Sequence, residues 1–335
     1  MSRRALRSHR GMTLLEVMVA ALLLVAVMAV AMQVVGVGVR VARQNEQTTN
    51  TNDSARLAAE VMLRDIRIAG SMQGIFMSDG ATGRLINPMF TEAGPNGTDA
   101  LWVVTPSPRA MQTDCTKVGS GVVVATASGS GPIAVNCTAP LVGAGNLLVT
   151  NFSRSALITP SSLTATSVTF SEGGIQNYGP YPEKGGMLKG DMVLPVQVVR
   201  YSVSIVAPCS ATRPCLLRQV GNVTTNPAAP FTIPAGARTD RYNDIEDLQI
   251  AWGSGTPVTF NSGHSPLYNP ATAYTAMRIN VVGVSPLPIR GENGALMALT
   301  PVTVEDHAPA PVVDGYRRSV YRRRVELLNN GALNL

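Results

Sequence analysis

The clearest feature of the hydrophobic pattern is a long apolar run near the amino terminus. Residues 17–39 contain no charged residue and one strongly polar residue, Gln33. At ~1.5 Å per residue, a helix over this run measures roughly 35 Å, which is enough to cross a hydrocarbon core of about 30 Å. The run therefore predicts a membrane-spanning helix.

A second helical pattern follows a polar stretch at residues 44–53. Apolar residues recur there at helical spacing, namely Leu57, Ala58, Val61, Met62 and Ile66, and the pattern stops at Gly70. This spacing predicts an amphipathic helix with a glycine stop, continuous with the apolar run. We expect one long helix over residues 12–70, with its transmembrane half at 17–39 and one face of its second half lying on a β-sheet.

From residue 71 onward, short apolar runs alternate with turn residues. These runs lie at residues 101–104, 122–127, 147–150, 168–170, 196–206, 216–220, 248–252 and 277–284. Together with 31 Gly, 23 Pro and only 14% charged residues in 335, they predict a largely antiparallel β-rich domain over 71–335. Two stretches, 127–132 and 222–234, are rich in small residues or proline and are predicted as loops. The expected fold class is α+β.

The distribution of charge indicates an exported chain more than one that binds nucleic acid. The net charge is +6, but Arg3, Arg4, Arg7 and Arg10 precede the apolar run, and without them 23 basic residues face 21 acidic ones. Four arginines before the run, against Arg40 and Arg43 after it, place the amino terminus in the cytoplasm by the positive-inside rule. The rest of the chain is then expected on the far side of the membrane.

An ordinary secretory signal is the alternative interpretation of the same run. Ala29-Val30-Ala31 has the small-x-small form that signal peptidase accepts. Glu16 argues against it, because an ionised carboxylate in an apolar segment costs ~3 kcal/mol and usually serves a partner. A cleaved signal has no use for such a group.

The residues around Glu16 carry a resemblance to a known family. They are Gly11-Met12-Thr13-Leu14-Leu15-Glu16-Val17-Met18. This segment resembles the amino-terminal motif of type IV prepilins and pseudopilins. The resemblance implies that prepilin peptidase removes the leader 1–11 by cutting between Gly11 and Met12, and that the new amino terminus at Met12 is methylated. It also implies that Glu16 pairs with the terminal amine of a neighbouring subunit during assembly, which offsets the cost of burying either charge alone.

Several later segments narrow the resemblance. They lie at residues 63–70, 199–203, 215–218, 245–253, 277–283 and 321–325, in an order similar to that of PilW-like minor pilins. Segment 63–70 is also similar to the J-type pseudopilins of type II secretion.

The narrower resemblance implies a minor pilin of a type IV pilus. Its partners would be prepilin peptidase, other major and minor pilins, and an assembly platform in the inner membrane. The chain would first cross the inner membrane once and then enter a pilus in the periplasm or at the cell surface. A type II secretion pseudopilin, and an adhesion or DNA-binding module at a pilus tip, remain as alternatives.

Four cysteines, Cys115, Cys137, Cys209 and Cys215, all lie in the part expected to be exported, where disulfides persist. Three pairings are possible, and we favour the local ones, Cys115 with Cys137 and Cys209 with Cys215. A metal site is disfavoured because the spacing is wrong and no histidine is near.

Residues for catalysis or cofactor binding are scarce. His264 and His307 lie in proline-containing loops, where solvated side chains are expected, and no nucleophile elbow or metalloprotease motif occurs. The acidic residues Asp240, Asp244, Glu246 and Asp247 lack the spacing of a calcium loop. The basic residues Arg317, Arg318, Arg322, Arg323 and Arg324 are expected on an edge strand with solvated charges. We therefore expect no enzyme activity, no cofactor and no metal, and nucleic-acid binding is disfavoured.

Overall fold

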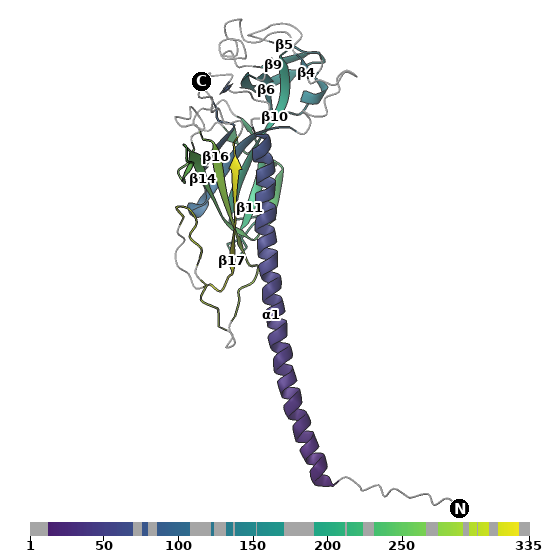
Figure 1. Cartoon of the computed structure of the whole chain (residues 1–335). Helices are drawn as coiled ribbons and strands as arrows, with labels where there is room; N and C mark the ends of the chain where they lie inside the picture. Colours follow the sequence, from purple (N-terminus) through teal and green to yellow (C-terminus); the bar gives the residue numbers. More distant parts are fainter. Residues whose placement is uncertain are drawn as a thin grey trace, which may run out of the picture. The chain divides into compact units, whose positions relative to one another are not determined.

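The computed structural model describes residues 13–69, 76–79, 86–107, 122–123, 132–136, 138–151, 153–170, 191–211, 213–223, 231–265, 274–290, 295–299, 301–307 and 314–327. The chain divides into two units, Met1–Thr49 and Asn50–Leu335. One helix, α1 (Leu14–Ile68), runs through both units (Figure 1). The antiparallel sheets of the second unit, with the end of α1 packed on them, confirm the predicted α+β class.

The first unit consists of the amino-terminal part of α1. This part includes a stretch that is long and apolar enough to cross a membrane, and the protein buries none of it. A membrane anchor and a signal sequence both have this character.

Three sheets make up the β-structure of the second unit among the described residues. The largest contains β1 (Phe76–Asp79), β2 (Met89–Ala93), β3 (Asp99–Pro106), β4 (Val122–Val123), β6 (Asn146–Thr150), β7 (Arg154–Ile158), β10 (Met192–Ser204), β11 (Cys215–Val223), β12 (Phe231–Thr232) and β13 (Thr239–Asn243). The second runs in the order β15 (Thr259–Asn261), β14 (Ile245–Ser254), β16 (Ala276–Val284) and β17 (Arg318–Glu326). A small third sheet joins β5 (Ile133–Ala134), β9 (Ser167–Phe170) and β8 (Pro160–Leu163).

Strand β10 organises the largest sheet because it is long enough to serve two sets of partners. Its first residues pair with β4 and β6, and its later residues pair with β3 on one side and β11 on the other. All these pairings are antiparallel, and β1 with β7 is the parallel exception among the described strands. Short 3-10 turns, η1 (Pro95–Gly97) and η3 (Ala139–Leu141), precede β3 and β6.

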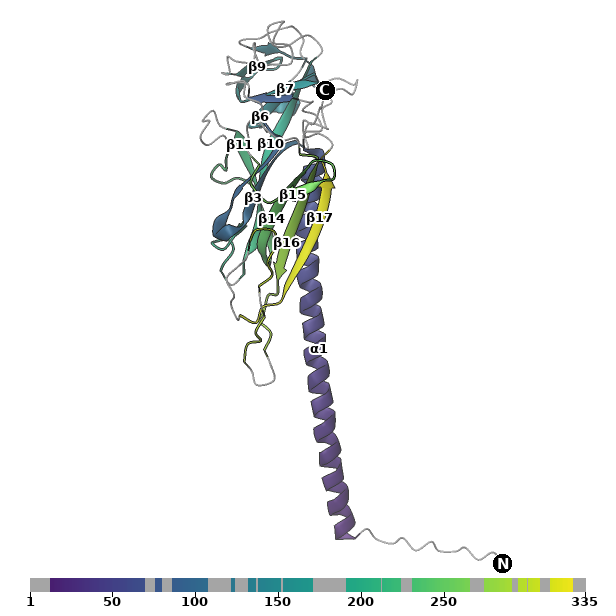
Figure 2. The same ribbon diagram turned by 60° about the vertical axis from the view of Figure 1, so that its left-hand side comes forward.

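The main core lies between residues 55–69 and both larger sheets (Figure 2). Three alanines of α1, Ala55, Ala58 and Ala59, are fully buried there, together with Met62 and Ile66. Small side chains let the helix backbone approach the strands closely. The prediction that Leu57 belongs to the buried face of the helix was wrong, because this side chain is 56% exposed. The buried face is instead the one that carries the three alanines.

Strands occur at all eight predicted runs, although their bounds differ from the prediction. The loop predicted at 222–234 was partly wrong, because Asn222 and Val223 belong to β11 and pair with Thr232 and Phe231 of β12. A glycine explains this close approach: a Cβ at Gly221 would lie 2.6 Å from the carbonyl oxygen of Thr232. Most of the loop predicted at 127–132 lies outside the described residues.

Candidate functional site

Thr13 and Glu16 form a reciprocal cap at the start of α1. The Glu16 carboxylate accepts hydrogen bonds from the Thr13 backbone nitrogen at 3.0 Å and from its hydroxyl at 3.2 Å, and the Glu16 nitrogen donates to Thr13 Oγ1 at 3.3 Å. This is a capping box, which the Thr-x-x-Glu spacing could have predicted. Glu16 thus points back toward the amino terminus. Gly11 and Met12 lie outside the described residues.

The helix beyond this cap presents apolar side chains on every face. Leu14 is 80% exposed, and large apolar side chains remain exposed as far as Val41. A surface of this kind is stable only against lipid or other apolar protein surfaces. This surface is that of a membrane anchor or a signal sequence.

Three distant segments meet at Asp65, which is buried at the far end of α1. Its Oδ2 accepts a hydrogen bond from the Tyr201 hydroxyl of β10 at 2.6 Å and another from Arg218 Nε of β11 at 2.9 Å. Tyr201 and Arg218 stand opposite each other in the β10–β11 register. The contacts fix the end of the helix to the centre of the largest sheet.

The pKa shifts of Tyr201 and Arg218 keep both groups protonated, so both remain hydrogen-bond donors to Asp65. Burial raises the pKa of the Tyr201 hydroxyl, and the adjacent Asp65 raises it further, so the hydroxyl stays a donor. Burial alone would lower the pKa of Arg218, but Tyr201 and Asp65 together raise it, so the guanidinium stays charged. Arg218 also reaches Asp240 of β13 at 3.3 Å. The network is polar but fully paired.

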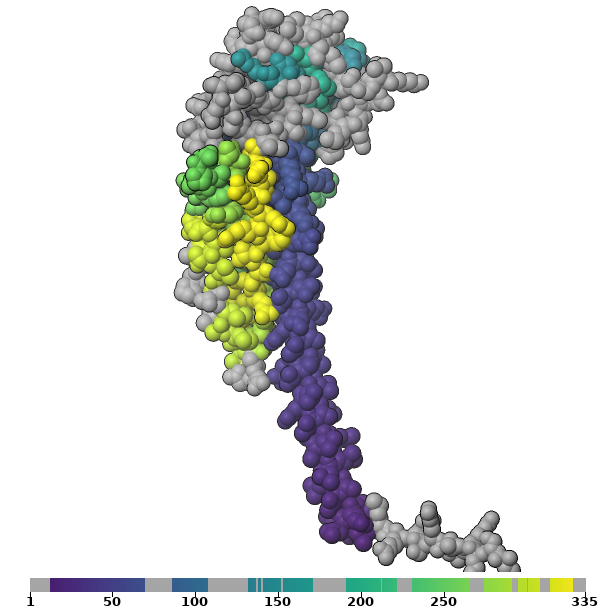
Figure 3. All heavy atoms as spheres, in the orientation of Figure 1, coloured from purple at the N-terminus to yellow at the C-terminus, as the bar shows by residue number. Residues whose placement is uncertain are grey.

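At the other end of the packed part of α1, the helix meets β16 and β17. A Cβ at Gly283 would lie 2.7 Å from the Thr51 carbonyl oxygen and 3.2 Å from the Ala55 Cβ, so only glycine permits this contact. Ser319 of β17 hydrogen-bonds Asn52. The space-filling view shows β17, in yellow, lying along the blue part of the helix (Figure 3).

A second polar cluster joins the two larger sheets. Strand β15 pairs only with residues 252–254 of β14. The backbone nitrogen of Ile250, which has no partner in β15, donates a hydrogen bond to Asp99 Oδ2 of β3 at 2.6 Å. Gln249 Nε2 donates at 2.9 Å both to the Gly97 carbonyl oxygen and to Asp247 Oδ1. We call Asp99, Asp247, Gln249 and His307 the seam cluster.

The two acids of the seam cluster are pushed toward the protonated form. Burial raises the pKa of Asp99 to about 7, although the hydrogen bond from Ile250 opposes the shift. Burial also raises the pKa of Asp247, against hydrogen bonds from Gln249 and His307. Both shifts have the same cause, the burial of these carboxyl groups where the two larger sheets meet.

The expectation that both histidines are solvated was wrong for His307. Its Nδ1 lies 2.7 Å from Asp247 Oδ2, and its side chain is 20% exposed. His264 is more open, at 43%, with Nδ1 3.7 Å from Asp99 Oδ1. Folding brings Asp99, at the start of β3, and the loop that carries His307 to β14. The local sequence carries no signal of these contacts.

The acidic residues near β14 separate in the fold, because each faces a different partner. Asp240 pairs with Arg218 and Arg238, Asp244 with Arg213, Glu246 with Arg318, and Asp247 with His307. Within the described ranges, no group of three or more His, Cys, Asp or Glu side chains is placed to hold a metal ion.

The basic carboxyl-terminal segment forms the edge strand β17, as predicted. Arg322, Arg323 and Arg324 are exposed, but the prediction of solvated charge was wrong for Arg318. The Arg318 side chain is 5% exposed and binds Glu246 at 2.5 and 2.9 Å and Asp314 at 2.5 and 3.1 Å. Arg318 therefore attaches the start of β17 to Glu246 of β14, and its charge is paired and not solvated.

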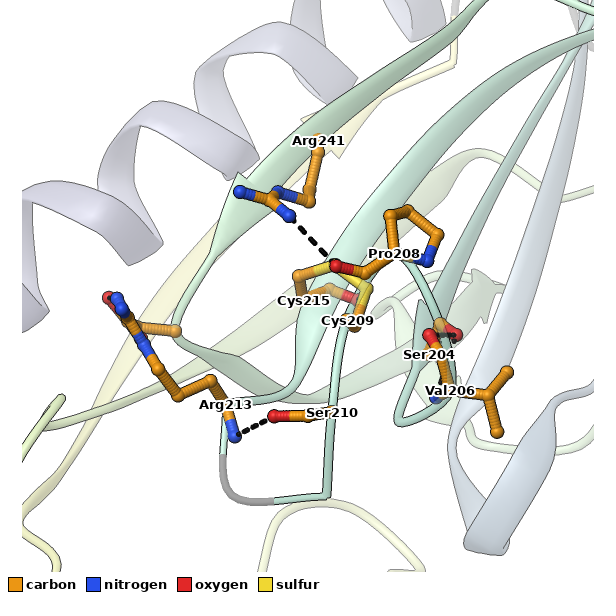
Figure 4. The surroundings of a disulfide bond; sticks show 9 residues. Ser204, Val206, Pro208, Cys209, Ser210, Arg213, Cys215 and Arg241 are labelled. Atoms are coloured by element: carbon orange, nitrogen blue, oxygen red, sulfur yellow. Dashed lines mark hydrogen bonds and ion pairs between the residues drawn. A yellow bond between two sulfur atoms is a disulfide. The ribbon is translucent and has the colours of Figure 1, made fainter.

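The predicted disulfide between Cys209 and Cys215 is present, with a Cα–Cα distance of 5.7 Å (Figure 4). It closes the hairpin between β10 and β11. Arg241 Nη1 donates to the Pro208 carbonyl oxygen at 2.8 Å beside it. The predicted bond between Cys115 and Cys137 lies outside the described residues.

No family model, curated protein or solved structure matches this chain.

Proposed function

We propose that this chain is a structural subunit similar to the PilW-like minor pilins, required for assembly of a type IV pilus and processed by prepilin peptidase. The observation that carries the proposal is the motif from Gly11 to Glu16 at the start of α1. That helix is apolar and unburied in its first part and carries a β-domain on its end. A subunit held first by lipid and then by other helices needs this combination.

The capping box supports a specific sequence of events. Before processing, Thr13 satisfies the Glu16 carboxylate locally. A cut between Gly11 and Met12 creates an amine one residue before Thr13. Because the carboxylate already points back toward the amino terminus, it is oriented to accept such an amine, including that of a neighbouring subunit. Extraction from the membrane then follows as lipid contacts are replaced by helix contacts.

Mass spectrometry of the mature protein tests the processing. We expect an amino terminus at Met12 carrying one methyl group, and a Gly11→Val variant that stays uncut. A mature start at Met32, after Ala29-Val30-Ala31, would show a secretory signal instead. An uncut Met1 in the wild type would also overturn the proposal.

A neutral variant separates the two possible roles of Glu16. Glu16→Gln keeps an acceptor for the cap but removes the charge. We expect normal cleavage and reduced incorporation into pili, whereas Glu46→Gln, an exposed change in the same helix, leaves both unchanged. Normal incorporation of Glu16→Gln would mean that the cap, not the charge, is what matters.

A type II secretion pseudopilin is the alternative, because its motif and processing would be the same. Deleting the gene distinguishes them: loss of surface pili with normal protein secretion supports the pilus subunit, and the reverse result supports the pseudopilin. An adhesion or DNA-binding role for residues 71–198 predicts that pili persist when this region is removed while adhesion or DNA uptake is lost.

A further inference from the structure

A cavity of about 380 Å³ opens in the second unit beside the seam cluster. Its lining comes from the turn η1, the disulfide-closed hairpin of β10 and β11, the starts of β14 and β17, the end of β16, and residues 301–307. Ligand-binding cavities typically begin at about 300 Å³. The volume is therefore sufficient for one or two amino-acid side chains.

The lining of the cavity carries more acidic than basic side chains. Glu246 and Asp314 share a single guanidinium, that of Arg318. Burial opposes ionisation of Asp314, but hydrogen bonds from Arg318 and the backbone lower its pKa, so it is ionised. Asp247 and His307 form a separate pair on the same lining. In the ion pairs that the described residues form around Arg318, two carboxylates face one guanidinium, which leaves a balance of one negative charge.

Both carboxylates remain accessible, although their arginine is not. The Glu246 side chain is 35% exposed and that of Asp314 is 22% exposed, against 5% for Arg318. An incoming cation can therefore reach carboxylate oxygens without displacing the guanidinium. An anion would meet the same oxygens and be repelled.

The other lining residues are mostly apolar, although Asn96, Thr98 and Tyr316 are among them. Among them Val203 and Val284 are buried, whereas Ile205 and Val302 are 37% and 36% exposed. Val206, next to Ile205 in the chain, is 68% exposed. A lining that combines apolar side chains with an excess of carboxylate suits a long side chain that has an apolar stem and a cationic end. Lysine and arginine are the side chains of this form.

We propose that this cavity is a docking site for a lysine- or arginine-bearing segment of a partner protein. The exposed apolar residues of the lining, and Val206 next to them, favour a peptide segment with apolar neighbours over a small polar solute. The excess of carboxylate in the lining selects the cationic side chain. The proposal does not depend on whether the chain enters a pilus, because it rests on the second unit alone.

A peptide probe tests recognition in the full chain, purified in detergent micelles. The probe is acetyl-Leu-Arg-Leu-methylamide, and its control contains citrulline, which has the shape of arginine without its charge. Ligand-observed NMR should give a dissociation constant at least tenfold lower for the arginine peptide. Equal binding of the two peptides, or no binding of either, would overturn the proposal.

Substitutions at Ala211 locate the binding. This residue is exposed and lines the cavity, so Ala211→Trp fills the space without removing an internal contact. We expect at least a tenfold loss of affinity, and none for Ala165→Trp, a matched change at an exposed bend between β8 and β9. Ala211→Lys should weaken binding and Ala211→Glu should retain it. Intrinsic tryptophan fluorescence and resistance to protease verify that each variant is folded, and unchanged affinity in folded Ala211→Trp would refute the assignment.

A photo-crosslinking residue at Val302 identifies the occupant in cells. Adducts to a different protein, lost in Ala211→Trp, would support the proposal. Adducts only to a second copy of this chain, or adducts unaffected by Ala211→Trp, would overturn the choice of partner.

Discussion

Removing the Asp65 carboxylate tests whether the end of α1 is held by its polar network or by apolar packing alone. In Asp65→Ala the Arg218 guanidinium, with its side chain 12% exposed, keeps Asp240 at 3.3 Å as its carboxylate partner and the Tyr201 hydroxyl at 3.1 Å. The Tyr201 hydroxyl loses its acceptor in a site without solvent. Breaking a buried ion pair from one side costs ~3–5 kcal/mol. Because Asp240 remains, we expect a loss near the lower end, about 3 kcal/mol of unfolding free energy.

The matched control lies on the same helix. Arg56 and Glu60 form an i,i+4 pair at 2.7 Å whose side chains are 62% and 49% exposed. Exposed pairs of this kind contribute ~0.3–0.5 kcal/mol, so Glu60→Ala should scarcely change stability.

Urea unfolding of the full chain in detergent micelles measures both effects. Tryptophan fluorescence reports the second unit, because Trp102 and Trp252 both lie in its strands. Replacing the whole network with Asp65→Leu, Tyr201→Phe and Arg218→Met should recover most of the loss, since no buried polar group is then left without a partner. A cost below about 1 kcal/mol for Asp65→Ala, or one equal to that of Glu60→Ala, would refute the reasoning.

Three further changes test other parts of the fold. Burial raises the pKa of Asp99 from an ordinary value of 3.8 to about 7, so the folded chain binds this proton more tightly than the unfolded chain. The free energy of unfolding should therefore fall as pH rises from about 4 to 7, by up to about 4 kcal/mol. Asp99→Asn should flatten this slope in urea titrations at pH 5 and pH 8, and an unchanged slope would contradict the assignment. Gly283→Val places a side chain against Thr51, and we expect an overpacking loss of ~1–3 kcal/mol and faster protease cleavage within residues 50–69. Replacing Cys209 and Cys215 by alanine should lower the free energy of unfolding by about 2 kcal/mol in the chain-entropy model, measured by urea unfolding without a reducing agent, and an unchanged midpoint would contradict this contribution.

The helix and the main strands could be predicted because their signals are local. An apolar run of 23 residues and a 3.6-residue period fix a helix with little reference to the rest of the chain. The alternation around Val199 and Ile250 likewise marks strands. Short strands such as β12 and β15 were not predicted, because two or three residues carry no period and form only when a partner edge is present.

The polar sites could not be predicted for a related reason. Asp65, Tyr201 and Arg218 each stand in a segment that the sequence singles out, yet their contact spans 136 and 153 positions. The same holds for Asp247 and His307, which are 60 positions apart. Sequence spacing on a strand shows which face a residue occupies, but not what covers that face.

The two kinds of signal therefore support different parts of the proposed function. The amino-terminal motif is local: Thr13 and Glu16 meet across one helical turn, and any copy of this segment will form the same cap. It bears on processing and on entry into a fibre. Partner choice depends instead on surfaces made by long-range contacts, and the cavity beside Arg318 is such a surface, since it assembles only when β14, β16 and β17 are paired. If both proposals are correct, Glu16→Gln should impair assembly without changing affinity for the arginine peptide, whereas Ala211→Trp should weaken peptide binding at least tenfold without changing cleavage after Gly11.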